Sequence, residues 1–62
     1  MIQLGRIYFD ELLKIHYVVT AYYPTSVPGT PIQCPAYEII KVNEPDRKIY
    51  TNKETIRSWK LC

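Results

Sequence analysis

Few side chains in this sequence could carry out catalysis or bind a metal, and they are widely scattered. There is one histidine, His16, and the two cysteines, Cys34 and Cys62, lie far apart in the sequence. A metal site needs several Cys, His or carboxylate ligands at short spacings, and nucleophilic catalysis needs a cysteine or serine beside a base. Neither pattern occurs here, so we predict no metal, no cofactor and no catalytic residue.

Asp10 and Glu11 are adjacent carboxylates, the residue type that acid–base and metal sites use. Neighbouring residues of a strand point to opposite faces, so only a turn could bring the two together. We therefore interpret this pair as a solvated turn. His16 falls among the polar positions of a predicted strand, without a recognisable catalytic partner.

The length of 62 residues limits the chain to a single small domain, residues 1–62. A chain of this size buries only about 60% of the surface that its unfolded form exposes. That is enough for one small core but not for a cleft walled by several elements, so we predict that the protein is not an enzyme. The net charge of +2 is a weak bias, and acidic residues interrupt the basic ones.

The N-terminal residues lack the apolar stretch of a signal peptide, and no apolar run is long enough to cross a bilayer. We therefore expect a cytoplasmic protein with no membrane partner. In that compartment Cys34 and Cys62 are expected to be free thiols.

The residue pattern predicts a mainly β domain. Six tyrosines and many isoleucines and valines favour strands, and apolar residues alternate clearly from Leu13 to Tyr23, where the length suggests a bulge near Thr20. The predicted strands are Ile2–Phe9, Leu13–Tyr23, Ala36–Asn43, Lys48–Thr51 and a short one within Trp59–Cys62.

Two further signals concern the second half of the chain. Glu44–Arg47 has the composition of a type I turn, with proline at its second position. Thr51 or Asn52 could cap a helical turn over Glu54–Ser58, with Glu54 reaching back as in a capping box. Ile56 and Trp59 would then face the core together.

The segment Pro24–Pro35 contains four prolines between two strands. Val27–Thr30 has the pattern of a type II turn, and the other prolines favour extended backbone. A long, stiff loop on a small β scaffold is a plausible binding surface. We predict that partner contacts are made by Tyr22, Tyr23, Val27, Pro28 and Ile32.

The tyrosines and Trp59 could line a groove for a proline-rich or methylated peptide. For Tyr17, Tyr37 and Trp59 we favour a core role, because aromatic rings give a small domain much buried area. For Tyr22 and Tyr23 both interpretations stay open.

The order of these elements resembles an SH3-like small barrel. The resemblance lies in Tyr37–Val42, the turn Glu44–Arg47, Lys48–Thr51, the turn Lys53–Ser58 and the terminal Trp59–Leu61. It is an order of elements and not a sequence motif, and it implies an SH3-like barrel or a bent antiparallel sheet of about five strands with one short helical turn near the C-terminus. Such an architecture hosts binders of many kinds, so it implies no site residues.

The leading hypothesis is a non-enzymatic protein-interaction module, a small adaptor or inhibitor that binds another protein and is encoded by a phage or plasmid. A second hypothesis is nucleic-acid binding by the basic C-terminal third. A third is a structural subunit that forms homo-oligomers through its sheet edges. The residues of the nucleic-acid hypothesis are Lys41, Arg47, Lys48, Tyr50, Lys53, Arg57 and Lys60.

Overall fold

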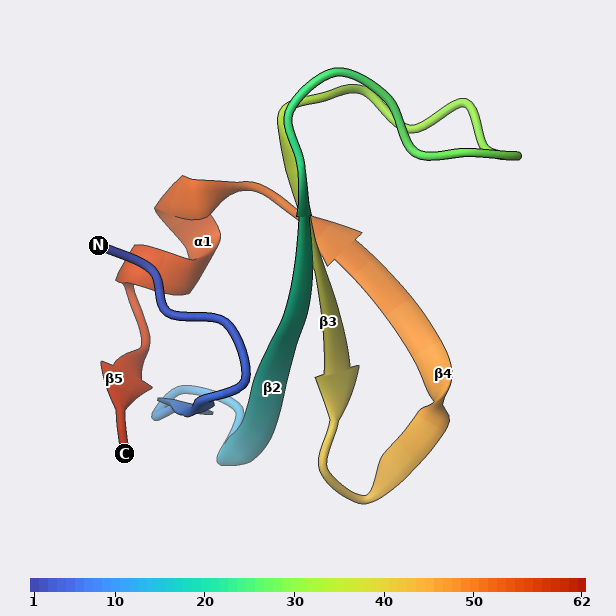
Figure 1. Cartoon of the computed structure of the whole chain (residues 1–62). Helices are drawn as coiled ribbons and strands as arrows, with labels where there is room; N and C mark the ends of the chain where they lie inside the picture. Colours follow the sequence, from blue (N-terminus) through green and yellow to red (C-terminus); the bar gives the residue numbers. More distant parts are fainter.

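Five antiparallel strands and one short helix make up the fold, which a computed structural model describes for all residues, 1–62 (Figure 1). The strand order is β4-β3-β2-β1-β5, and the sheet is bent but not closed, because β4 and β5 lie at opposite edges. The predicted mainly β fold with one short helix near the C-terminus is confirmed. The elements are β1 (Ile7–Asp10), β2 (Ile15–Tyr23), β3 (Ala36–Lys41), β4 (Glu44–Thr51), α1 (Lys53–Arg57) and β5 (Lys60–Leu61).

The central strand β2 has the predicted bulge. Its register with β3 shifts between Val19 and Ala21, which places the irregularity at Thr20. The strand begins at Ile15 and not at Leu13, because Lys14 adopts a left-handed backbone conformation with φ of 60°. The Lys14 N–H donates to the Asp10 carbonyl at 2.8 Å and closes the β1–β2 turn.

The first predicted strand, Ile2–Phe9, is wrong in its N-terminal half. Gly5 has a φ of 77°, which breaks the extended backbone, and β1 begins only at Ile7. Residues 1–6 instead form an arm that stays attached to β2, since the Gly5 N–H donates to the Val19 carbonyl at 2.7 Å. The arm carries Ile2 against the core.

The interpretation of Asp10 as part of a solvated turn is also wrong. Asp10 is buried, and its Oδ1 accepts hydrogen bonds from the N–H groups of Leu12 at 3.0 Å and Leu13 at 3.3 Å. These bonds satisfy backbone donors of a tight turn, which is a common use of aspartate. Glu11 is exposed and pairs with Lys60 at 2.6 Å.

The turn predicted at Glu44–Arg47 is wrong as well. Lys41 pairs directly with Glu44, so the chain reverses at Val42 and Asn43. The next pair is Ile40 with Lys48, which leaves Pro45–Arg47 as a bulge on β4. Proline has no N–H to give to a ladder, and a bulge on an edge strand is where it is tolerated. The predicted strand Lys48–Thr51 forms the second half of β4 and pairs with β3.

The helix α1 is capped by Asn52, one of the two predicted residues. Its Oδ1 accepts from the Thr55 N–H at 3.0 Å and from the Thr55 hydroxyl at 2.9 Å. The predicted return contact from Glu54 is replaced by Thr55, which occupies the third helical position. After the helix, β5 pairs with Tyr8 and Phe9 of β1.

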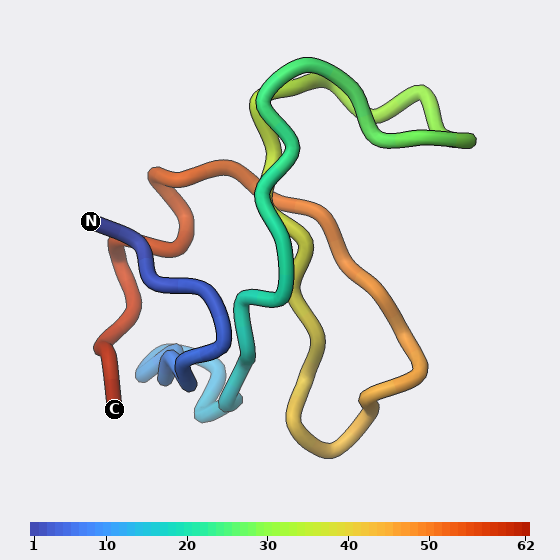
Figure 2. Tube along the Cα trace, in the orientation of Figure 1, coloured from blue at the N-terminus to red at the C-terminus, as the bar shows by residue number.

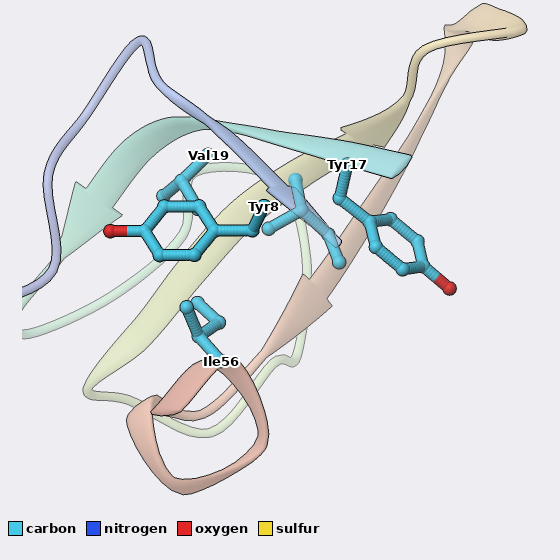
Figure 3. Close-up of a cluster of buried hydrophobic side chains, with 5 residues drawn as sticks. Tyr8, Tyr17, Val19 and Ile56 are labelled. Carbon is cyan, nitrogen blue, oxygen red and sulfur yellow. The ribbon is translucent and has the colours of Figure 1, made fainter. Parts of the chain in front are cut away.

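The core lies on one face of the sheet, between the sheet, the N-terminal arm and α1. Figure 3 shows the Tyr8 ring between Val19 and Ile56, both of which are fully buried. Ile39 of β3 belongs to the same cluster. Ile56 therefore faces the core, as predicted. Tyr17 belongs to the same cluster, whereas Tyr37 and Trp59 are only partly buried. Trp59 stacks on Tyr17 with ring centroids 4.3 Å apart.

The helical content of the chain is confined to α1, and no helix is long and apolar enough to cross a membrane.

Candidate functional site

The loop Pro24–Pro35 extends well beyond the end of the sheet (Figures 1 and 2). Its base is fixed, because Tyr23 of β2 pairs with Ala36 of β3. The predicted type II turn is supported by its geometry: the Thr30 N–H donates to the Val27 carbonyl at 3.2 Å, and Gly29 has a φ of 77°.

The loop does not present Val27 as an exposed tip. Val27 is only 4% exposed and does not belong to the core cluster, so the loop packs on itself around this side chain. Ile32 is half-buried, and Pro28 is exposed. All four prolines of the loop are exposed, together with its polar residues Thr25, Ser26, Thr30 and Gln33.

A groove lies at the base of this loop and is the candidate site. It has a volume of about 360 Å³ and runs between the returning arm of the loop and the start of α1. Tyr22 is 44% exposed, and its ring centroid lies 4.7 Å from that of Tyr37, with the rings tilted by 36°. The lining residues are Tyr22, Gln33, Cys34, Pro35, Tyr37, Asn52, Lys53 and Glu54.

The two neighbouring tyrosines that we predicted as partner contacts lie on opposite faces of β2. Tyr22 lies on the same face as its cross-strand partner Tyr37, and both residues line the groove. Tyr23 points to the other face, where its ring centroid lies 6.3 Å from that of Tyr50. Of the five predicted residues, only Tyr22 therefore lines the groove.

Sequence reasoning missed most of the groove. Tyr37 was predicted to serve the core. At the start of α1, Asn52 and Glu54 were predicted only as capping residues, and Lys53 was predicted only as a nucleic-acid contact. The signal that could have found Tyr37 is the register across the loop: pairing Tyr23 with Ala36 places Tyr22 opposite Tyr37. Gln33 and Cys34 carry no such signal.

The seven residues of the nucleic-acid hypothesis are distributed over three places. Lys41, Arg47 and Lys48 lie on the β3–β4 hairpin, and Tyr50 lies further along β4. Lys53 and Arg57 lie on α1, and Lys60 lies on β5 at the opposite edge of the sheet.

Three of these basic residues are already paired with carboxylates. Lys41 lies 3.6 Å from Glu44, Lys48 lies 3.9 Å from Glu38, and Lys60 is bonded to Glu11. Arg47, Lys53 and Arg57 have no carboxylate partner and are exposed.

Glu38 connects three strands on the sheet face opposite the core. It is only 7% exposed and accepts hydrogen bonds from the Thr20 hydroxyl at 2.8 Å and the Tyr50 hydroxyl at 3.0 Å. Burial raises the pKa of Tyr50, and the hydrogen bond to the Glu38 carboxylate and its charge raise it further. Burial and, next, the charge of Asp10 raise the pKa of Tyr17.

These raised pKa values predict a loss of stability in alkali. A tyrosine whose pKa is higher in the folded state than its ordinary 10.0 stabilises the fold fully below that pH, and this contribution is lost as the pH rises through the folded pKa. The melting temperature should be flat near pH 8 and fall above about pH 10. In Tyr50→Phe the fall should be shallower, with Tyr17 responsible for the remainder. An unchanged alkaline slope in this variant would show that Tyr50 ionisation is not linked to folding.

Both cysteines are free, and Cys34 is half-buried in the wall of the groove. No group of three or more His, Cys, Asp or Glu side chains is placed to hold a metal ion.

No protein-family model, curated protein or solved structure matches this chain. The geometry of the groove is therefore the basis for a functional proposal.

Proposed function

We propose that this protein is a non-enzymatic interaction module, an adaptor or inhibitor with an SH3-like fold, that binds an extended, proline-containing peptide segment of another protein. The observation that carries the proposal is the tyrosine pair Tyr22 and Tyr37 on the floor of the groove. Its rings are tilted and partly solvent-accessible, as in surfaces that receive proline rings.

A polyproline-type segment fits this groove chemically. It has a preformed backbone without internal hydrogen bonds, so its carbonyls are free to accept bonds from the partner. Gln33 on one wall and Lys53 on the other offer side-chain donors. Glu54 offers acceptors, so a segment with a basic residue would add a charge-assisted contact.

The position of the groove also favours binding. The paired residues Tyr23 and Ala36 hold the base of the loop, and the prolines restrict its backbone. A pre-restricted loop loses less conformational entropy when a ligand docks, which improves affinity.

The test is a selection from a library of random short peptides displayed on phage, followed by affinity measurement on the purified chain. We expect the selected peptides to be enriched in proline and to bind Tyr22→Ser at least about tenfold more weakly, which corresponds to about 1.4 kcal/mol. This loss is in the range of one aromatic packing interaction.

A matched control is Tyr23→Ser, because Tyr23 is the sequence neighbour on the opposite face. It should retain the affinity of the unaltered chain. Equal losses in the two variants, or selected peptides without proline enrichment, would contradict the proposed groove.

Nucleic-acid binding is the alternative that the unpaired Arg47, Lys53 and Arg57 favour. It predicts binding to mixed DNA and RNA that falls steeply with salt, because counterions are released when phosphates are contacted. Assembly through sheet edges is favoured less. The bulge with Pro45 interrupts the β4 edge, and β5 at the other edge has only two residues. Bulges and very short edge strands both hinder pairing with another sheet.

A further inference from the structure

A second hollow lies at the other end of the sheet, where β2 begins and β3 ends. It has a volume of about 350 Å³ and lies between the β1–β2 turn and the β3–β4 turn. It shares no residue with the groove at the loop, so a ligand here is independent of the proposed function. Its lining residues are Ile7, Lys14, Ile15, His16, Val42 and Asn43.

The apolar part of the hollow is open to solvent. Ile7 is 41% and Val42 is 49% exposed, although both are aliphatic residues in or beside strands. The two side chains belong to the sheet face opposite the core, where Ile7 is paired with Val18 and Val42 bonds through its N–H to the His16 carbonyl at 3.1 Å. A ligand with an aliphatic side chain would remove this surface from water.

The polar part of the hollow carries only positive or neutral groups. Lys14 has no carboxylate partner, and no lining residue is acidic. The His16 ring packs on Phe9 with centroids 4.6 Å apart, which holds it in place. The hollow therefore complements an aliphatic group that lies beside a negative charge.

Lys14 occupies a left-handed backbone position in the β1–β2 turn. A φ of 60° is costly for residues other than glycine, asparagine and aspartate, which are common in such turns. Strain of this kind is often found where a side chain serves a function. A lysine at this position places a cation at the hollow, which glycine or asparagine would not.

We propose that this hollow binds the C-terminal residue of a partner polypeptide, with its aliphatic side chain on Ile7 and Val42 and its carboxylate at Lys14 and His16. The volume is near the lower limit of ligand sites, which suits one terminal residue better than a long acyl chain. Asn43 supplies an amide that can bond the preceding peptide group, a group that a fatty acid lacks.

The test is a titration of the isotope-labelled full chain, in which binding is monitored by the chemical shifts of its amide NMR signals. The probes are acetyl-glycyl-alanyl-leucine with a free carboxylate, the same peptide with an amidated C-terminus, and octanoate. We expect the free-carboxylate peptide to shift the signals of Lys14, His16 and Val42 and to bind at least about tenfold more tightly than the amide. Octanoate should bind more weakly than the free-carboxylate peptide.

The decisive variant is Lys14→Asn, which removes the charge and relieves the backbone. It should melt at the same temperature or higher and lose at least about tenfold in affinity for the free-carboxylate peptide. Lys14→Arg should retain binding, and Lys53→Gln, at the other groove, should not change it. Equal binding of the amidated peptide, stronger binding of octanoate, or full affinity in Lys14→Asn would each overturn the proposal.

Discussion

Removal of residues 56–62 is expected to abolish cooperative unfolding altogether. This deletion takes away the fully buried Ile56, the stacking of Trp59 on Tyr17, and β5. Truncating a buried isoleucine to alanine alone costs about 2–5 kcal/mol. A core of this size supplies only about 3–5 kcal/mol of net stability, so the shortened chain should have none left.

The measurement is thermal and urea denaturation of a chain ending at Thr55, followed by circular dichroism. Ile56→Ala should be destabilised more than Trp59→Ala, because Trp59 is only partly buried. Cys62→Ser, which keeps the backbone bond from residue 62 to the Ile7 carbonyl, serves as the control with near-normal stability. A sharp, full-size transition in the truncated chain would show that the core forms without α1.

Replacement of residues 25–34 by a short Gly/Ser turn is expected to weaken peptide binding at least about tenfold while the fold persists. The buried Val27 packs within the loop and not in the core, so its removal leaves the sheet intact. Shortening a surface loop changes the closure free energy only slightly. The same replacement removes Gln33 and Cys34, which form one wall of the groove.

Two measurements are needed on this variant: its melting temperature and its affinity for the peptides selected on the unaltered chain. We expect a melting temperature within a few degrees of the original and affinity reduced by at least about tenfold. A folded variant that keeps full affinity would exclude the loop side of the groove as part of the binding site.

The strand pattern was predictable because alternation of apolar residues depends only on local sequence. This is why the end of β2 at Tyr23 and its bulge near Thr20 were predicted correctly, although the strand begins at Ile15 and not at Leu13. The turn at Glu44–Arg47 was predicted wrongly because Pro45 and Asp46 suit a turn and a bulge equally. The real turn at Val42 and Asn43 follows from the pairing of Lys41 with Glu44, which local residue types do not specify.

The site was less predictable than the strands, because it depends on contacts between distant parts of the chain. Tyr22 could be identified from its position beside the loop, but Tyr37 joins it only through strand register. Val27 is buried without belonging to the core cluster, and the start of α1 lines the groove although it is distant in sequence from the loop. Composition carries no information on either arrangement.

Chemical-shift mapping is the direct test of peptide binding in the groove at the base of the loop. The isotope-labelled chain would be titrated with a peptide selected on it, and each amide signal followed. We expect the largest shifts at residues that line the groove, namely Tyr22, Gln33, Tyr37 and Lys53. Shifts confined to the exposed basic residues Arg47 and Arg57, with none at Tyr22 or Tyr37, would contradict peptide binding in the groove.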